Sequence, residues 1–94
     1  MLAEVKSSCE NDFLKTKVGG SEFWIGGTDI QNEGFWIWSS SKTNVTFFDW
    51  MPYEPTNYGG VEHCLEINYQ SSRQWNDDDC STINRFICEK SLFQ

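Results

Sequence analysis

Long apolar runs, close cysteine pairs and basic residues are what this 94-residue chain has least of. No apolar stretch approaches 18 residues, so no segment is predicted to insert into a membrane. Lysine and arginine total 7 against 14 aspartates and glutamates, and the net charge of −7 argues against nucleic acid or an anionic membrane as partner. The chain has no CxxC pair and His63 is its single histidine, so the spacing typical of a zinc site is missing.

Aromatic residues and cysteines are abundant for this length. Phe, Trp and Tyr make up 16% of the chain, and large rings provide much burial per residue for one small domain. The 4 cysteines and the glycosylation sequon Asn44-Val45-Thr46 indicate an oxidising compartment. The protein is therefore expected to be secreted or extracellular. Its acidity fits both cation binding and ordinary solubility.

Local patterns predict one helix followed by short strands, which is an α+β arrangement. Ser7 and Glu10 have the spacing of a capping box, so a helix is expected near 8–17. The polar stretch 39–46 is expected to be a loop, as is 47–60, and loops as long as the second are usually functional or disordered. Strands are expected at 23–25, 35–38, 64–67, 73–75 and 85–88.

Side chains that end in oxygen gather between Glu54 and Cys80, in three short segments. Carboxylate and amide oxygens are the ligands that calcium selects, because this ion takes about six to eight oxygens in a tolerant geometry. A calcium ion held at a surface with open positions can dock neighbouring sugar hydroxyls, so the pattern predicts a calcium-dependent sugar binder. The segments are Glu54-Pro55-Thr56, Glu62-His63-Cys64 and Trp75-Asn76-Asp77-Asp78-Asp79-Cys80.

The order of these landmarks resembles the C-type lectin-like domain over essentially the whole chain. The resemblance implies a helix packed on short antiparallel sheets with a long calcium-binding loop, formed by residues 1–94 as a single domain. Family domains begin with a strand and a first helix that this chain is expected to lack, as a mature product or fragment would. The matching motifs are Trp24-Ile25-Gly26-Gly27, Phe47 with Trp50, Glu54-Pro55, Glu62 with Cys64, Trp75-Asn76-Asp77 before Cys80, and Phe86-Ile87-Cys88-Glu89.

By resemblance, Cys64 and Cys80 form the family's inner disulfide. Cys88 then lacks its usual partner, so Cys88 is expected either to pair with Cys9 or to stay reduced, and Cys9 is expected to be free or unusual. The strand missing at the N-terminus would leave 85–89 as an exposed sheet edge. Reduced stability or self-association of the chain is therefore expected.

The resemblance also implies a set of ligands for one calcium ion and for the sugar bound to it. The set is Glu54, Thr56, Glu62, Asn76 and Asp77. The Glu54–Pro55 peptide bond is expected to be cis. Glu54 in the first triplet position resembles the mannose-type arrangement, which suits mannose, fucose or N-acetylglucosamine. Thr56 departs from the family, which has an amide or carboxylate there, and so weakens both the calcium site and the sugar code.

The family's neighbouring auxiliary calcium site maps to Asp29, Glu33, Asn57 and Glu62. Asn57 and His63 replace acidic residues of that pattern, so a polar loop network without an ion is the alternative. Tyr53 and Tyr58 are candidates for stacking on a sugar ring. The other large aromatic residues are expected in the core, namely Trp24, Trp36, Trp38, Trp50 and Phe86.

Two rival functions were weighed against the sugar-binding hypothesis. Paired carboxylates also serve glycosidases, but here Glu54 and Glu62 belong to a metal-ligand pattern and no activated nucleophile is recognisable. An enzyme is therefore not expected. The stronger rival is a lectin-like module that binds protein or mineral without sugar, which Thr56 and the missing N-terminal part make credible.

Overall fold

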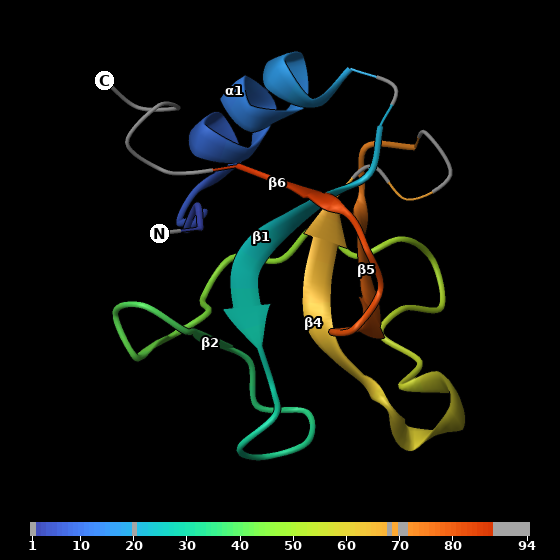
Figure 1. Ribbon diagram of the computed structural model, residues 1–94. Helices are drawn as coiled ribbons and strands as arrows, with labels where there is room; N and C mark the ends of the chain where they lie inside the picture. The colour runs from blue at the N-terminus through green and yellow to red at the C-terminus, as the bar shows by residue number, and fades with distance from the viewer. Residues whose placement is uncertain (1, 20, 68, 70–71, 88–94) are drawn as a thin grey trace.

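The computed structural model describes residues 2–19, 21–67, 69 and 72–87 as one helix and a mainly antiparallel sheet. Figure 1 shows the helix at one end of the sheet and a short 3₁₀ turn at the other. The elements are α1 (Ser8–Val18), β1 (Phe23–Thr28), β2 (Ile37–Trp38), β3 (Thr43–Asn44), η1 (Tyr58–Gly60), β4 (Glu62–Ile67), β5 (Trp75–Asp79) and β6 (Arg85–Phe86). The predicted α+β class is confirmed.

Helix α1 begins and ends where its capping residues predict. The Ser7 hydroxyl accepts the Glu10 backbone N–H at 3.2 Å, and the Glu10 carboxylate accepts the Lys6 N–H at 3.0 Å. The first bond satisfies a donor that the first helical turn leaves without a partner, and the second holds the chain that enters the helix. Gly19 follows the helix with φ of +59°, a conformation that glycine adopts without steric cost.

The sheet has the order β3-β2-β1-β4-β5, and β6 pairs with β1 in parallel. β4 begins two residues earlier than predicted. The predicted strand 73–75 is wrong apart from its last residue, because β5 runs through the acidic stretch to Asp79. Pairing with β4 explains this extension, since Asp77 lies opposite Leu65 and Asp79 opposite Glu62. Tertiary pairing therefore overrides the low strand propensity of aspartate.

Tryptophans form the centre of the core. Trp38 and Trp75 are 1% and 0% exposed and meet edge to face at 6.2 Å, and Trp36 is buried too. Trp24 and Trp50 are only half-buried. The expectation for Phe86 is wrong, because its side chain is 64% exposed. Its neighbour Ile87 packs on the core, so the period-two alternation of an extended chain turns Phe86 outward.

Glycine is required at one position of β1. A Cβ atom at Gly27 would lie 2.2 Å from Cδ1 and 3.1 Å from Cγ of Leu65. Because Leu65 is completely buried, it has no room to move aside. The second glycine of the Trp24–Gly27 motif therefore lets β1 pack closely against Leu65 of β4, the strand that begins at the predicted site.

A polar network ties α1 to the loop that precedes η1. The buried Asn11 accepts the indole N–H of Trp75 at 3.0 Å and donates its amide to Asp49 at 2.8 Å. Lys15 forms an ion pair with the same Asp49 carboxylate at 2.9 Å, and the Trp75 backbone N–H donates to the Asp49 carbonyl at 2.8 Å. These bonds fix the beginning of the long loop against β5.

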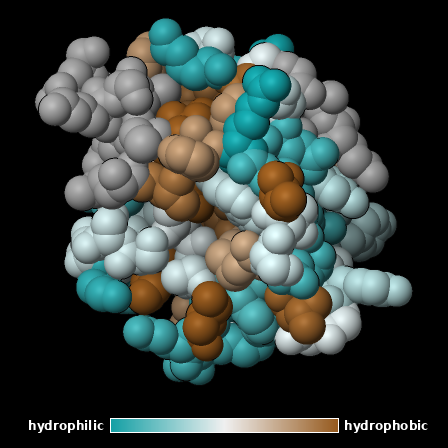
Figure 2. All heavy atoms as spheres, viewed as in Figure 1, coloured by the Kyte–Doolittle hydropathy of each residue, from teal (hydrophilic) through white to brown (hydrophobic). Residues whose placement is uncertain are grey.

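The predicted Cys64–Cys80 disulfide is present, with its Cα atoms 5.2 Å apart. Cys9 is exposed and carries a free thiol, whereas Cys88 lies outside the described residues. No helix in the described part of the chain is long and apolar enough to cross a membrane. On the face shown in Figure 2, hydrophobic residues form small separate groups among hydrophilic ones.

The network around Asn11 can be tested by comparing two neighbouring positions of α1. Asn11→Ala should lower the free energy of unfolding by about 1–3 kcal/mol, because the buried Trp75 indole N–H loses its acceptor. Asp12→Ala, at an exposed position of the same helix, should change it by less than about 0.5 kcal/mol. Urea denaturation in the presence of a chelator measures both. Equal effects would show that the network does not stabilise the fold.

Candidate functional site

The five predicted ligands come from three segments that the sheet brings together. Glu54 and Thr56 lie in the long loop, Glu62 begins β4, and Asn76 and Asp77 lie on β5, the antiparallel partner of β4. We call these five residues the loop site. The Glu54–Pro55 peptide bond is cis, as predicted.

Asp77 holds the loop onto the sheet. Its side chain is completely buried, and its two carboxylate oxygens accept the backbone N–H groups of Thr56 at 3.0 Å and Asn57 at 2.6 Å. Hydrogen bonds from backbone N–H groups to a carboxylate are charge-assisted and therefore strong. Each oxygen keeps a second lone pair, so Asp77 combines anchoring with the capacity to accept one further contact per oxygen.

Glu62 closes the same loop from the other side. One of its carboxylate oxygens, Oε1, accepts the Thr56 hydroxyl at 3.1 Å and the Tyr58 backbone N–H at 2.9 Å. The side chain of Asn57, a residue with φ of +48°, accepts the Glu62 backbone N–H at 3.0 Å. In this arrangement Thr56 donates its proton to Glu62, which leaves lone pairs of the hydroxyl oxygen available as acceptors.

Asn76 is oriented by a buried carboxylate behind it. Its amide nitrogen donates to Glu66 at 3.0 Å, and the second oxygen of Glu66 accepts the Asn84 amide at 2.8 Å. Because the nitrogen of Asn76 is engaged with Glu66, its carbonyl oxygen is the atom left for a cation. Burial raises the pKa of Glu66 to about 7, against the hydrogen bonds from the two asparagines, which lower it.

A cavity of about 310 Å³ opens at the loop site. Four of the five predicted residues line it, while the Asp77 carboxylate is turned into the loop backbone. Asp78 and Tyr69 also line the cavity and were not placed there by the sequence prediction. Asp78 follows Asn76 by two residues on β5, so strand alternation was the signal that could have identified it. The lining residues are Glu54, Thr56, Tyr58, Glu62, Tyr69, Asn76 and Asp78.

The two predicted stacking tyrosines differ in position. Tyr58 lines the cavity with 80% of its side chain exposed. Tyr53 is 95% exposed and is not among the lining residues. Tyr58 therefore has the better position for contact with a ligand bound in the cavity.

The loop site combines carboxylate oxygens with no nearby basic side chain among the described lining residues. Oε1 of Glu54 is buried and has no hydrogen-bond partner in the described part of the chain. Burial, followed by the contact with the Asp77 carboxylate, raises the pKa of Glu54 to about 7. No lysine or arginine is among the described residues that line the cavity. A divalent cation bound by these oxygens would satisfy the orphaned acceptor and balance the carboxylates, so the residues fit calcium.

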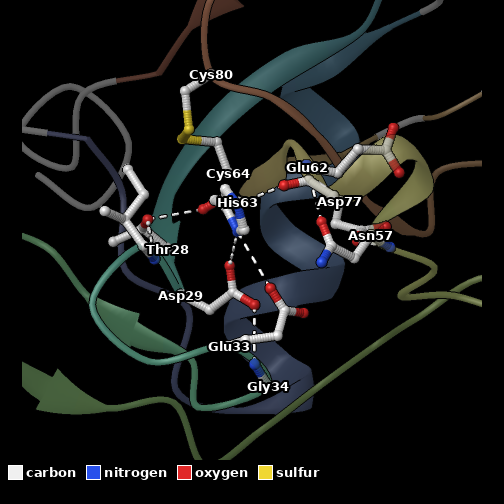
Figure 3. Close-up of polar contacts among 12 residues, drawn as sticks. Thr28, Asp29, Glu33, Gly34, Asn57, Glu62, His63, Cys64, Asp77 and Cys80 are labelled. Carbon is white, nitrogen blue, oxygen red and sulfur yellow. Dashed lines mark hydrogen bonds and ion pairs between the residues drawn. A yellow bond between two sulfur atoms is a disulfide. The ribbon is translucent and has the colours of Figure 1, made fainter.

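A second charged group lies on the other side of the start of β4. Nδ1 of His63 is 2.9 Å from Oδ1 of Asp29 and 3.3 Å from Oε1 of Glu33. We call these three residues the His63 cluster; Figure 3 shows them beside Glu62 and Asn57. The hydrogen bond to Asp29 raises the pKa of His63. Of the predicted auxiliary set, Asp29 and Glu33 contact His63, and Asn57 accepts the Glu62 backbone N–H.

Comparison with known proteins places this architecture in a family. The family model of the lectin C-type domain matches residues 1–90, and the chain belongs to this family. Perlucin of Haliotis laevigata is 35% identical over 95% of this chain, which spans 60% of perlucin's length. The carbohydrate-recognition domain of the mouse scavenger receptor C-type lectin is 35% identical, with a TM-score of 0.84 over 93% of this chain and 68% of that one.

A third relative has the same fold but is an antifreeze protein. The herring type II antifreeze protein is 31% identical, with a TM-score of 0.82 over 93% of this chain and 68% of its own. Domains of this family are binding proteins without enzymatic activity, so this chain is not an enzyme. They bind glycans in general and generally bind calcium. The antifreeze protein indicates that the same scaffold also serves other surfaces.

The buried Glu66 makes stability depend on pH when calcium is withheld. Its pKa is about 7 in the fold against 4.5 ordinarily, so the folded chain binds more protons than the unfolded chain between these values. Stability should therefore fall as pH rises from about 5 to 7.5, by an amount on the order of 1–3 kcal/mol. The raised pKa values of Glu54 and His63 act in the same direction.

Urea denaturation in a chelator at pH 5.0 and 7.5 measures this dependence. Glu66→Gln should reduce it, because glutamine does not titrate and Asn84 can rotate its amide to match the new donor. Asp12→Asn, at an exposed position of α1, should leave it unchanged. If the wild-type protein in chelator is more stable at pH 7.5 than at pH 5.0, the raised pKa assigned to Glu66 in the folded chain is wrong.

Proposed function

We propose that this chain is a calcium-dependent carbohydrate-binding domain whose loop site holds the ion. The observation that carries the proposal is the buried Oε1 of Glu54, which has no hydrogen-bond partner among the described residues and lies beside the carboxylate of Asp77 at a cavity open to solvent. A buried acceptor without a partner costs about 1–3 kcal/mol. A bound cation removes that cost, and the cavity leaves room for the hydroxyls of a sugar.

The proposed ligands are Glu54, Thr56, Glu62, Asn76 and Asp77. When bound, calcium supplies a Lewis-acidic docking point for two neighbouring hydroxyl groups. The protein then has two tasks, which are to hold the oxygens in place and to pair with the hydroxyl protons. Glu54 and Glu62 accept hydrogen bonds from those hydroxyls, Asp77 keeps the loop attached to β5, and Glu66 keeps the Asn76 carbonyl turned toward the ion. Asp78, which lines the cavity, adds a further acceptor.

Mannose-type sugars are the proposed ligands, because Glu54 occupies the first triplet position. The site is open and its ligand contacts are few, so we expect a single domain to bind a monosaccharide with a dissociation constant of about 1 mM. Useful avidity then needs clustering of domains. Self-association of this chain would provide it, and the exposed Ile83 and Phe86 near β6 support that proposal.

The Cys64–Cys80 disulfide supports an extracellular location, since such bonds persist in oxidising compartments. A module that recognises protein or mineral without sugar is the second candidate function. The likeness to the herring type II antifreeze protein favours it, together with Thr56, whose hydroxyl is bonded to Glu62. Retention on a surface regardless of chelator would favour this second candidate.

Removing the charge of Glu54 tests the calcium proposal directly. Glu54→Gln should weaken calcium binding at least about tenfold, because a formal charge is lost from the ion's coordination while the side-chain shape is kept. Calorimetric titration of calcium and chelator-reversible retention on mannose resin measure the two steps. Asp12→Asn, which removes one carboxylate charge at an exposed position of α1, is the control. Calcium binding that survives Glu54→Gln unchanged would contradict the proposal.

The sugar preference can be tested by moving the carboxylate within the triplet. Glu54→Gln combined with Thr56→Asp restores the lost charge, so calcium binding should recover relative to Glu54→Gln alone. Reversing the donor and acceptor positions should shift preference from mannose to galactose by about tenfold, the scale of one hydrogen bond. Competition by free mannose and galactose on an immobilised glycan measures the ratio. An unchanged ratio with restored calcium binding would show that the triplet does not select the sugar.

A further inference from the structure

The geometry points to a transition-metal site, best suited to zinc, formed by Asp29, Glu33 and His63 at the position where the family places an auxiliary calcium. The three side chains each offer one ligand atom, and all of these atoms lie within 4.8 Å of one another. This inference concerns the His63 cluster alone and does not depend on sugar binding at the loop site.

The spacing of the donor atoms suits a small tetrahedral ion. Zinc bonds of about 2.0–2.1 Å place neighbouring ligand atoms about 3.3 Å apart. Nδ1 of His63 lies 2.9 Å from the Asp29 oxygen and 3.3 Å from the Glu33 oxygen. Only small side-chain movements are needed to receive zinc between them.

The supporting hydrogen bonds already orient two of the three ligands. Nε2 of His63 is 3.2 Å from the Gly60 carbonyl oxygen, which only accepts, so Nε2 carries the ring proton there. Metal-bound histidines use the same kind of bond to fix the nitrogen that faces the ion. The second oxygen of Asp29 accepts the Gly34 N–H at 3.0 Å, which directs the first toward His63 (Figure 3).

The chemistry of the donors favours zinc over calcium. Calcium requires about six to eight oxygens, whereas an imidazole nitrogen with two carboxylates is a donor set that zinc prefers. Of the other two residues of the auxiliary set, Asn57 uses its side-chain oxygen to accept the Glu62 N–H, and Glu62 uses Oε1 to accept the Tyr58 N–H. His63 thus stands where an additional hard oxygen would be needed.

The cluster is buried on one side and open on the other. The Asp29 side chain is fully buried, while those of His63 and Glu33 are 28% and 54% exposed. An ion can therefore enter from solvent, and its fourth position is left to water or to an outside donor. The site also joins two elements, since Asp29 and Glu33 follow β1 and His63 lies on β4. Bound zinc would cross-link the turn after β1 to β4.

The single histidine makes a direct measurement available. All imidazole signals in a proton–nitrogen or proton–carbon NMR spectrum of the full chain come from His63. Titrating chelator-treated protein at pH 7.5 with zinc chloride should move the Nδ1 signal by the large shift of a coordinated nitrogen, with 1:1 stoichiometry. Calcium chloride, bound at the neighbouring loop site through Glu62, should cause only a small shift without coordination of Nδ1. Zinc that leaves the His63 signals unmoved, or calcium that moves them as zinc does, would overturn the proposal.

Variants separate this site from other zinc ligands and from the loop site. His63→Gln should weaken zinc binding in calorimetry at least about tenfold and abolish the rise in Tm that zinc causes. Cys9→Ser, which removes the one free thiol among the described residues, should retain both effects. His63→Glu should reverse the preference, because it exchanges nitrogen for a hard oxygen. Undiminished zinc binding by His63→Gln would refute the assignment.

The loop-site variant Glu54→Gln separates this proposal from the proposed lectin function. It should keep zinc binding at the His63 cluster while losing calcium binding. His63→Gln should show the reverse pattern. Loss of both metals in one correctly folded variant, as judged by its NMR spectrum, would contradict two independent sites.

Discussion

The buried carboxylate of Asp77 is the interaction on which the rest of the loop site depends. It lies on β5, accepts the backbone N–H groups of Thr56 and Asn57, and so attaches a long loop to the sheet at the point where Glu54 and Thr56 project. The pairing of β4 with β5 then brings Glu62 and Asn76 to the same cavity. A loop of this length would otherwise sample many conformations at a considerable cost in entropy. The buried Asp77 carboxylate, which accepts two backbone N–H groups, restricts the loop to one conformation in which its oxygen-bearing side chains have defined positions.

The same arrangement explains how an acidic chain tolerates its own charge. Burial raises the pKa of Glu54 and Glu66 to about 7, and the hydrogen bond to Asp29 raises the pKa of His63, so all three groups are displaced toward the protonated form. Folding around such groups is costly unless protons or metal ions balance them. The charged side chains at the start of β4 belong to two separate groups. Glu62 faces the loop site, and its neighbour His63 faces Asp29 and Glu33. Adjacent residues of one strand therefore serve different donor sets.

Secondary structure was predicted correctly where a local sequence pattern specifies it, and incorrectly where contacts with other strands specify it. The capping residues Ser7 and Glu10 define the start of α1, and alternating residues define the second half of β4. The acidic stretch of β5 was missed because four consecutive polar residues resemble a loop until β4 pairs with them. Phe86 was placed in the core because composition favours burial, yet Ile87 takes that place. Asp78 and Tyr69 were missed at the cavity because their approach depends on strand direction and loop path.

The sequence by itself determined the family, the helix, the Cys64–Cys80 pair and the identity of the oxygen-bearing residues, because these follow from motif order and from the chemistry of each side chain. The tertiary structure decided how the grouped side chains are oriented and which further residues join them. It turned the Asp77 carboxylate into the loop backbone, brought Asp78 to the cavity, and gathered His63 with Asp29 and Glu33 although the sequence spacing had argued against zinc. Family motifs can name residues from separate segments, but their orientation and their additional neighbours depend on the sheet that joins those segments.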